Sequence, residues 1–225
     1  YNPNLLSGRN FSKNFLSLQK DTLKPIYNRA LMATYPPGSM FKLIQSLIGL
    51  EENLVSYDEQ VYIRNNRIGD LAPEGMYDLS KAIIKSSNNY FYNLFRSIIN
   101  QNKNSNTFVD SRIGLDEWSN YVKMFGLGSN LNFNISATNS GFVPSSNYYN
   151  TYYGVNRWKF SNIYSLSIGQ GELLVTPIQM ANLAAIIANR GFYYNPNIVL
   201  EIGNEKVPES DKNQVNISGE HFEYV

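Results

Sequence analysis

The sequence predicts one globular domain that is built mainly from α-helices and contains little β-sheet. Its 225 residues fit the size of a single domain, and 43% of them are hydrophobic, which is enough to form a core. Apolar residues recur at spacings of three and four in several stretches, and helix-cap residues mark the ends of those stretches. Few segments alternate between apolar and polar residues as half-buried strands do.

Five stretches are expected to be helical. The first begins directly after the turn Tyr35-Pro36-Pro37-Gly38, and the second has Asp78 as its N-cap. The fourth ends at Gly126, which suits the position after a helix. The fifth opens with Thr176-Pro177-Ile178-Gln179, a capping box with proline at the first helical position. The expected ranges are 39–50, 79–85 and 89–100 for the first three and 177–189 for the fifth. The fourth places Trp118, Tyr121, Val122 and Phe125 on one face.

The segments between these helices carry weaker signals. Residues 1–35 are polar, turn-rich and weakly periodic, and residues 128–165 are expected to form a long irregular surface segment. Residues 203–216 resemble a loop, and a short helix is expected to start at Ser218. The whole chain, 1–225, is therefore treated as part of one domain.

Composition excludes several classes of function. Lys and Arg number 19 against 18 Asp and Glu, so a net charge of +1 provides no basic surface for nucleic acid. There is no cysteine, and His221 is the single histidine, which argues against a Ser-His-Asp triad and a multi-histidine metal site. Apolar runs are shorter than the roughly 18–20 residues that span a bilayer. Covalent chemistry would need a base other than histidine.

Ser39 and Lys42 form a candidate nucleophile and base. A residue three positions after a serine on the first helical turn shares its face, so the two side chains are expected to touch. Lysine can accept the serine proton only when its pKa is lowered, and the apolar residues around Lys42 favour burial. Spacing alone is weak evidence, because Ser17-Leu18-Gln19-Lys20 has the same spacing without the Pro-Gly turn or the apolar helix.

Ser86-Ser87-Asn88 fits the second member of the S-x-x-K, S-D-N and K-T-G motif set, in the form Ser-x-Asn. The Ser86 hydroxyl could relay a proton, and the Asn88 amide could hold a substrate carbonyl and contact the lysine. Ser145-Ser146-Asn147 has the same spacing. We expect Asn88 and not Asn147 to lie in the cleft with Ser39, because only Asn88 sits between two apolar helices.

Five longer segments occur in a fixed order along the chain: Tyr1-Asn2-Pro3-Asn4, Tyr27-Asn28-Arg29-Ala30, Tyr35–Lys42, Ser86–Phe91 and Gly169–Ala181. Together they resemble the class B penicillin-binding proteins, and most closely their elongation-type (penicillin-binding protein 2-like) branch. The resemblance spans nearly the whole chain.

The resemblance implies the α-rich portion of the α+β penicillin-binding protein and serine β-lactamase-like transpeptidase fold, with most of its five-stranded sheet outside this chain. It also implies a D,D-transpeptidase that acts on the D-Ala-D-Ala stem peptides of peptidoglycan and binds β-lactam antibiotics. By motif position, Ser39 is the nucleophile, Lys42 the base, and Ser86 and Asn88 the second-motif pair. The Ser39 N–H is then one half of the oxyanion hole, and Gly169–Ala181 has a supporting role.

The family further implies a membrane glycosyltransferase as partner and a location at the periplasmic face of the bacterial inner membrane, with no nucleic acid partner. No cofactor is expected. No metal is expected either, because residues 53–85 lack the cysteine and histidine ligands that some relatives carry.

The third family motif, Lys-Thr-Gly or Lys-Ser-Gly, does not occur in this sequence. We therefore expect an excerpt of a longer protein that is inactive or impaired alone. Two other functions stay open: a non-catalytic or degenerate binding module, and a D,D-carboxypeptidase or β-lactamase-type hydrolase.

Overall fold

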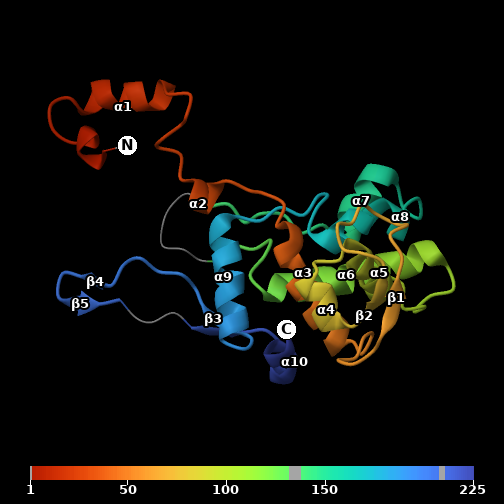
Figure 1. Cartoon of the computed structure of the whole chain (residues 1–225). Coiled ribbons are helices and arrows are strands. Elements are labelled where there is room, and N and C mark those ends of the chain that lie inside the picture. The colour runs from red at the N-terminus through yellow and green to blue at the C-terminus, as the bar shows by residue number, and fades with distance from the viewer. Residues whose placement is uncertain (1, 132–137, 208–210) are drawn as a thin grey trace.

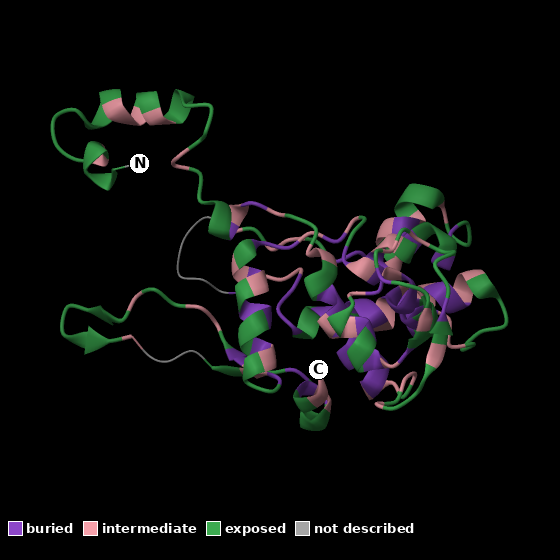
Figure 2. Ribbon diagram, viewed as in Figure 1, coloured by how far each residue is buried: buried purple, intermediate pink, exposed green. Residues whose placement is uncertain are grey.

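Helix α3 (Phe41–Glu51) is the centre of the fold, and nine of its residues are buried. The computed structural model describes residues 2–131, 138–207 and 211–225. α5 (Asn88–Ile99) and α6 (Thr107–Met124) pack on α3, and Trp118 of α6 donates a hydrogen bond from Nε1 to Gln45 Oε1 at 3.0 Å. α5 and α6 approach closely at Gly114, where a Cβ would lie 2.0 Å from the Ile99 carbonyl oxygen. The buried residues therefore gather around these three helices (Figure 2).

Shorter helices complete the body of the molecule. α4 precedes α5, α7 and α8 lie at one end, and α9 and α10 lie at the other (Figure 1). The capping box of α9 forms as expected, with the Thr176 side chain accepting from the Gln179 N–H and the Gln179 side chain accepting from the Thr176 N–H. The bounds are α4 Leu79–Ile84, α7 Ser146–Tyr153, α8 Phe160–Ile163, α9 Pro177–Ala188 and α10 Gly219–Tyr224, with 3₁₀-helices η2 Gly38–Met40 and η3 Tyr164–Ile168.

In the described residues, β-structure is limited to three two-stranded antiparallel sheets and two isolated bridges. This agrees with the expected helix-rich part of the fold. The pairs are β1 (Val61–Ile63) with β2 (Gly75–Tyr77), β3 (Phe192–Tyr194) with β6 (Lys212–Gln214), and β4 (Glu201–Ile202) with β5 (Glu205–Lys206).

Two arms project from the body. The first carries η1 (Pro3–Leu6) and α1 (Phe11–Lys20), neither of which has a buried residue, and it joins the body at α2 (Arg29–Met32). The second is the β4–β5 hairpin, whose strand residues are all exposed. Both arms stand away from the helices in Figure 1 and are mostly exposed in Figure 2. Their apolar residues therefore contribute little to the core.

Three expectations from sequence need correction. Residues 1–35 contain helices and not only turns, and residues 128–165 contain α7 and α8 around the fully buried Tyr149 and Trp158. Residues 203–216 contribute the strands β5 and β6. The fourth expected helix is α6, which begins at Thr107 and ends before Gly126 as expected.

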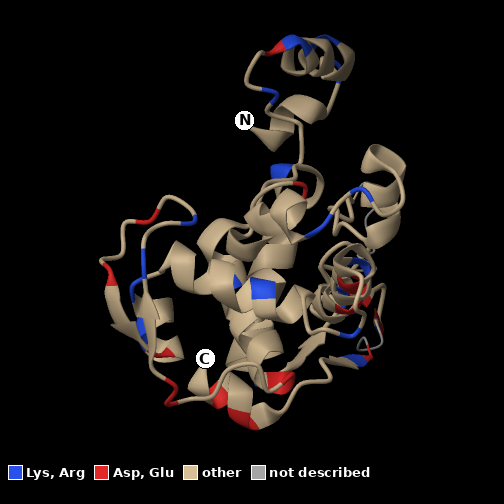
Figure 3. Ribbon diagram, turned by 90° about the vertical axis from the view of Figure 1, so that its right-hand side faces the viewer, with Lys and Arg blue, Asp and Glu red and all other residues tan. Residues whose placement is uncertain are grey.

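The surface carries both signs of charge. In the view of Figure 3, the Lys and Arg positions are scattered among the Asp and Glu positions and form no basic face. No helix in the described ranges is long and apolar enough to cross a membrane. The same ranges contain no group of three or more His, Cys, Asp or Glu side chains arranged to hold a metal ion.

Candidate active site

Ser39 lies at the exposed end of the central helix, on the 3₁₀-turn η2 that leads directly into α3. Gly38 adopts a φ of 60°, a left-handed conformation that turns the chain into the helix. Among the described residues, the Ser39 backbone N–H makes no hydrogen bond. The hydroxyl and an unpaired N–H of Ser39 therefore occupy the same exposed turn.

The segment around Gly169 packs against this turn and stabilises it through backbone hydrogen bonds. Gly38 donates its N–H to the Gly169 carbonyl oxygen at 2.9 Å, and Tyr35 and Val175 exchange two backbone hydrogen bonds, each of 2.9 Å. Gly169 has a φ of 68°, and a Cβ there would lie 2.4 Å from the Gly38 carbonyl oxygen and 2.7 Å from the Phe41 Cβ. Only glycine combines this conformation with so close an approach. The segments 35–42 and 169–181, which carry the family resemblance, thus contact each other beside Ser39.

Lys42 is buried, with 2% of its surface exposed. Its Nζ donates to the Ser86 carbonyl oxygen at 2.6 Å, the Ser86 Oγ at 2.9 Å and the Asn88 Oδ1 at 2.7 Å. These three acceptors match the three N–H donors of an ammonium group. Burial lowers the pKa of Lys42 to about 8, and the charge of Asp70 opposes this effect. A substantial neutral fraction is therefore available near neutral pH.

The direct contact expected between Ser39 and Lys42 is not made. No hydrogen bond joins these two side chains in the described structure; instead, Ser86 Oγ donates to Ser39 Oγ at 3.1 Å and accepts from Lys42 Nζ. The α3 turn places Lys42 towards the junction of α4 and α5, where Ser86 lies. The serine and lysine are thus connected through a second hydroxyl.

Ser86 owes its position to the end of α4. It has a φ of 51°, an uncommon left-handed conformation for a residue other than glycine. The Ser86 N–H donates to the Ile83 carbonyl and the Ser87 N–H to the Ala82 carbonyl, which is the Schellman pattern of a helix end. This turn directs both the Ser86 carbonyl and its hydroxyl to Lys42. Ser87 then caps α5 by accepting from the Tyr90 N–H.

Asn88 and Asn147 lie in different settings, as expected. The Asn88 Nδ2 donates to the Gly69 carbonyl oxygen at 2.7 Å, which fixes its Oδ1 towards Lys42. Asn147 is exposed on α7, and no hydrogen bond connects it to Ser39, Lys42 or Ser86 within the described residues. The structure therefore brings together the four residues singled out from the motifs: Ser39, Lys42, Ser86 and Asn88.

Sequence reasoning missed the loop that supports this cluster. Asp70 accepts hydrogen bonds from the Asn89 N–H at 2.8 Å and the Ser87 Oγ at 3.0 Å, and Asn89 is fully buried. One local signal was available, because Asp70 also accepts from the Ala72 N–H two residues on, in a turn that aspartate favours. Nothing in the spacing of Asp70 links it to residues 86–89.

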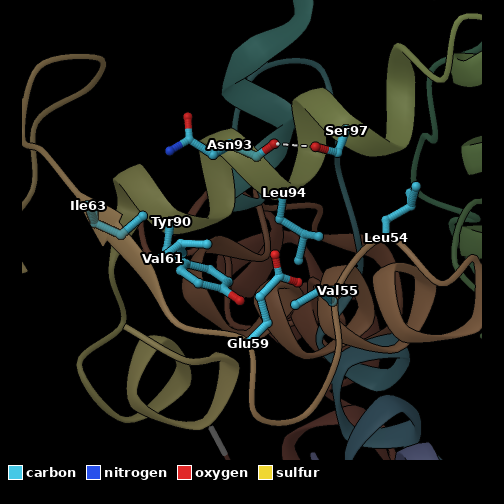
Figure 4. A pocket seen from close by; sticks show the side chains of 9 residues that line it. All are labelled: Leu54, Val55, Glu59, Val61, Ile63, Tyr90, Asn93, Leu94 and Ser97. Atoms are coloured by element: carbon cyan, nitrogen blue, oxygen red, sulfur yellow. Dashed lines mark hydrogen bonds between the residues drawn. The ribbon is translucent and has the colours of Figure 1, made fainter. Parts of the chain in front are cut away.

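A separate cavity of about 140 Å³ lies along the part of α5 that follows Asn88 and Asn89 (Figure 4). Tyr90, Leu94 and Ser97 of α5 form one side of it, and Figure 4 shows the Tyr90 hydroxyl and the Glu59 carboxylate pointing into the same space. Five of its nine lining residues are aliphatic, and its lining contains no lysine or histidine that could act as a base for Ser97. The Ser39 cluster is therefore the better candidate for covalent chemistry.

Comparison with known proteins agrees with this assignment of the fold. The family model described as "Penicillin binding protein transpeptidase domain" matches residues 1–225. The peptidoglycan D,D-transpeptidase MrdA of Acinetobacter baumannii is 26% identical over 238 aligned residues, which cover 100% of this chain and 33% of MrdA. The chain thus spans about a third of the length of this curated relative.

Solved structures show the same fold. The crystal structure of Pseudomonas aeruginosa PBP2 in complex with WCK 5153 matches with a TM-score of 0.80 and 25% identity, over 100% of this chain and 50% of that one. The complex between penicillin-binding protein PBP2 and MreC from Helicobacter pylori matches with a TM-score of 0.77 and 24% identity, over 100% of this chain and 39% of that one. The chain therefore belongs to the penicillin-binding protein transpeptidase domain family.

Proposed function

We propose that the protein is a peptidoglycan D,D-transpeptidase in which Ser39 is the nucleophile. The single observation that carries this proposal is the hydrogen-bonded chain from Ser39 Oγ through Ser86 Oγ to the buried Lys42 Nζ. A serine hydroxyl becomes a competent nucleophile when a positioned base removes its proton, and a lysine with a lowered pKa is such a base. The activity of the curated relatives points to the same reaction.

The acceptors around Lys42 define the route of the proton. A neutral lysine has two N–H donors and one lone pair, so one of its three partners must become a donor. The Ser86 carbonyl and the Asn88 Oδ1 are acceptors only, whereas the Ser86 hydroxyl can donate. Once Lys42 is neutral, the Ser86 hydroxyl turns to Lys42 and its oxygen accepts from Ser39. Ser86 is therefore the relay, and Lys42 the final proton acceptor.

The acyl-transfer step balances with these groups alone. Ser39 Oγ forms an ester bond with the carbonyl carbon of the penultimate D-Ala, the amide C–N bond breaks, and the leaving D-Ala amine takes the proton back through Ser86. An amine of a neighbouring stem peptide then attacks the ester carbonyl and forms a new amide bond. The ester C–O bond breaks, and the proton lost by the amine reaches Ser39 Oγ through Lys42 and Ser86. The unpaired Ser39 N–H is one donor for the oxyanion, and the second N–H of Asn88 Nδ2 is available to a substrate carbonyl.

The setting of this reaction is also proposed from relatives. The structural relatives include a PBP2–MreC complex and a peptidoglycan synthase complex, and both support partners from the cell-wall synthesis machinery. We propose, on the same family resemblance, that the site works at the periplasmic face of the inner membrane beside a glycosyltransferase, and that β-lactams acylate Ser39.

Intact-mass spectrometry of the full-length protein after incubation with a penicillin tests the nucleophile. We expect one adduct of the mass of the antibiotic, located on Ser39, and no adduct in the Ser39→Ala variant. Ser17→Ala is the matched control, because Ser17 and Lys20 have the same spacing on the exposed helix α1. This variant should be labelled like the wild type. An unlabelled wild type, or a stoichiometric adduct on Ser39→Ala, would contradict the proposal.

A further inference from the structure

We propose that Asp70 is a positioning residue of the Ser39 site, whose carboxylate clamps the turn 86–89 that holds the buried Lys42 ammonium. This inference rests on the proposed function of Ser39, Lys42 and Ser86. It adds a loop residue that lies outside the sequence motifs.

The clamp is formed by the two oxygens of one carboxylate. Asp70 Oδ2 accepts from the Asn89 N–H at 2.8 Å, the Ser87 Oγ at 3.0 Å and the Asn89 Nδ2 at 3.3 Å. Asp70 Oδ1 accepts from the Ala72 N–H at 3.0 Å and so anchors the side chain to its own loop. Hydrogen bonds to an ionised acceptor are about twice as strong as neutral ones. One side chain thus ties the start of α5 to loop 65–72.

Asn89 and Gly69 complete the same junction. The Asn89 Oδ1 accepts from the N–H groups of Arg67 at 3.0 Å and Ile68 at 3.3 Å, and its Nδ2 donates to the Ile68 carbonyl at 2.9 Å. The Gly69 carbonyl orients the Asn88 amide. A left-handed serine such as Ser86 is strained and persists only where surrounding contacts hold it. The Asp70 junction holds the residues that follow Ser86, namely Ser87, Asn88 and Asn89.

The charge of Asp70 is maintained by its donors. Burial alone would raise the pKa of the Asp70 carboxyl, but hydrogen bonds from backbone N–H groups, chiefly those of Asn89 and Ala72, and from the Ser87 hydroxyl outweigh it and hold the pKa below its ordinary value. The carboxylate is therefore ionised throughout the pH range in which Lys42 titrates.

Asp70 is the charged group whose field acts on Lys42. No carboxylate lies within 4.0 Å of the Lys42 Nζ among the described residues, and Asp70 is the charge that opposes the loss of its proton. The neighbours from η2, α4 and α5 are uncharged: Ser39, Ser86, Asn88 and the Phe91 ring, which lies 5.6 Å from Nζ.

The remaining charges of the packed elements are exposed or engaged elsewhere. Arg64 and Arg67 of the loop and Arg96 of α5 are exposed. On α3, Glu51 and Glu52 lie at the opposite end, beside His221 and Tyr121. On α4, Lys81 and Lys85 are exposed, and the Lys81 Nζ donates to the Met76 carbonyl. Removing the Asp70 charge should therefore change the titration of Lys42 without another carboxylate compensating.

The test measures the second-order rate of penicillin acylation against pH in the full-length protein. In Asp70→Asn, the loss of charge should move the midpoint of the rising limb to lower pH by about 0.5–1 unit. Loss of the clamp should lower the plateau rate by about 10–100-fold, because a small displacement of reacting groups is costly. Asp70→Glu keeps the charge, so its midpoint should stay while its plateau falls.

Asp116→Asn is the matched control. Asp116 also accepts from a backbone N–H and a serine hydroxyl, those of Ser146, but at the start of α7. The Asp116→Asn variant should show the same midpoint and the same plateau of the acylation rate against pH as the wild type. Ser87→Ala removes one donor to Asp70 and also the N-cap of α5. It provides a second test if Asp70→Asn does not fold, and its plateau should fall about 3–10-fold with an unchanged midpoint.

The outcomes separate two failures. If wild-type Ser39 is not acylated, the proposed function is wrong. If the wild type is acylated but the Asp70→Asn midpoint does not move, or if Asp116→Asn lowers the plateau as much, Asp70 is only a structural residue and the inference is overturned. An unchanged plateau in Ser87→Ala would overturn the clamp as well.

Discussion

Helix α5 carries polar groups in two settings, and the contrast shows what distinguishes a fully paired polar cluster from an unpaired one. At its N-terminus, Asn88 and Asn89 are bonded to a buried lysine and to the loop of Asp70. Further along, Tyr90 faces the Glu59 carboxylate in the cavity of Figure 4. Within the described residues, neither the Tyr90 hydroxyl nor the Glu59 carboxylate makes a hydrogen bond, whereas every donor of Lys42 is paired.

This difference has an energetic meaning. Polar groups that are paired in a buried, low-dielectric setting are fixed in direction and act on one another strongly. Groups that open to solvent are screened and free to reorient. The Ser39 cluster is therefore arranged before a substrate arrives, whereas the exposed Glu59 carboxylate has no fixed partner in the described structure. The four predictions below test this contrast, from the largest effect to the smallest.

Removing the relay should have the largest effect. Ser86→Ala leaves Ser39 and Lys42 in place but breaks the hydrogen-bonded path between them, so acylation by penicillin should slow by about 100–1000-fold, within the range of general-base catalysis. Stopped-flow acylation measures this rate. Ser97→Ala on the cavity side of α5 is the control. A loss of less than threefold in Ser86→Ala would mean that the proton takes another route.

Acidification should slow acylation steeply. The pKa of Lys42 is about 8, below its ordinary value, so the neutral base becomes scarcer as the pH falls. The rate should fall about tenfold per unit below pH 8, and at pH 6 it should be about 1% of its alkaline plateau. The measurement is the acylation rate between pH 5.5 and 9. A flat profile over this interval would show that Lys42 is not the base.

Substituting the glycine beside Ser39 should destabilise the turn. Ala at position 169 meets the Gly38 carbonyl at 2.4 Å, so we expect Gly169→Ala to lower the free energy of unfolding by about 2–4 kcal/mol. Gly203→Ala is a close control, because Gly203 has a φ of 65° and no atom within 4 Å of its missing Cβ. Urea unfolding compares the two. Equal losses would show that conformation alone requires glycine at 169.

Neutralising the cavity carboxylate should have the smallest effect. Glu59 makes no ion pair in the described structure, so Glu59→Gln should change the acylation rate by less than about twofold and the unfolding free energy by less than about 0.5 kcal/mol. Acylation kinetics measure the change in rate, and thermal unfolding measures the change in stability. A large loss of rate would mean that the two settings along α5 are coupled.

Local signals in the sequence predict much of this architecture. The Asp78 cap, the capping box at Thr176 and the apolar spacing of α3 each act within a few residues, and each element forms where these signals place it. The Ser39, Lys42, Ser86 and Asn88 set is also recognisable, because motif order is visible in the chain. The route from Ser39 to Lys42 is not, because it depends on the left-handed conformation of Ser86.

Local sequence signals do not predict features that depend on residues far apart in the chain. Asp70 bonds to Ser87 across 17 positions, and Tyr149 is buried because its hydroxyl donates to Glu172 at 2.6 Å. The strands of β4, β5 and β6 have only two or three residues each, too few to establish an alternation. Helix α1 buries no side chain, so its amphipathic pattern has no core to match.

The paired backbone bonds between Tyr35 and Val175 bear on the order of folding. They join residues 140 positions apart (175 − 35), so the brace beside the nucleophile cannot close until the intervening chain has condensed. Contacts of such long range are slow to form, because the entropy of the loop is lost before the contact stabilises anything. In a chain made from its N-terminus, Ser39 emerges before Val175, so the turn that supports Ser39 is completed only after Val175 has been made. The arrangement around Ser39 is therefore absent from nascent and partly folded molecules.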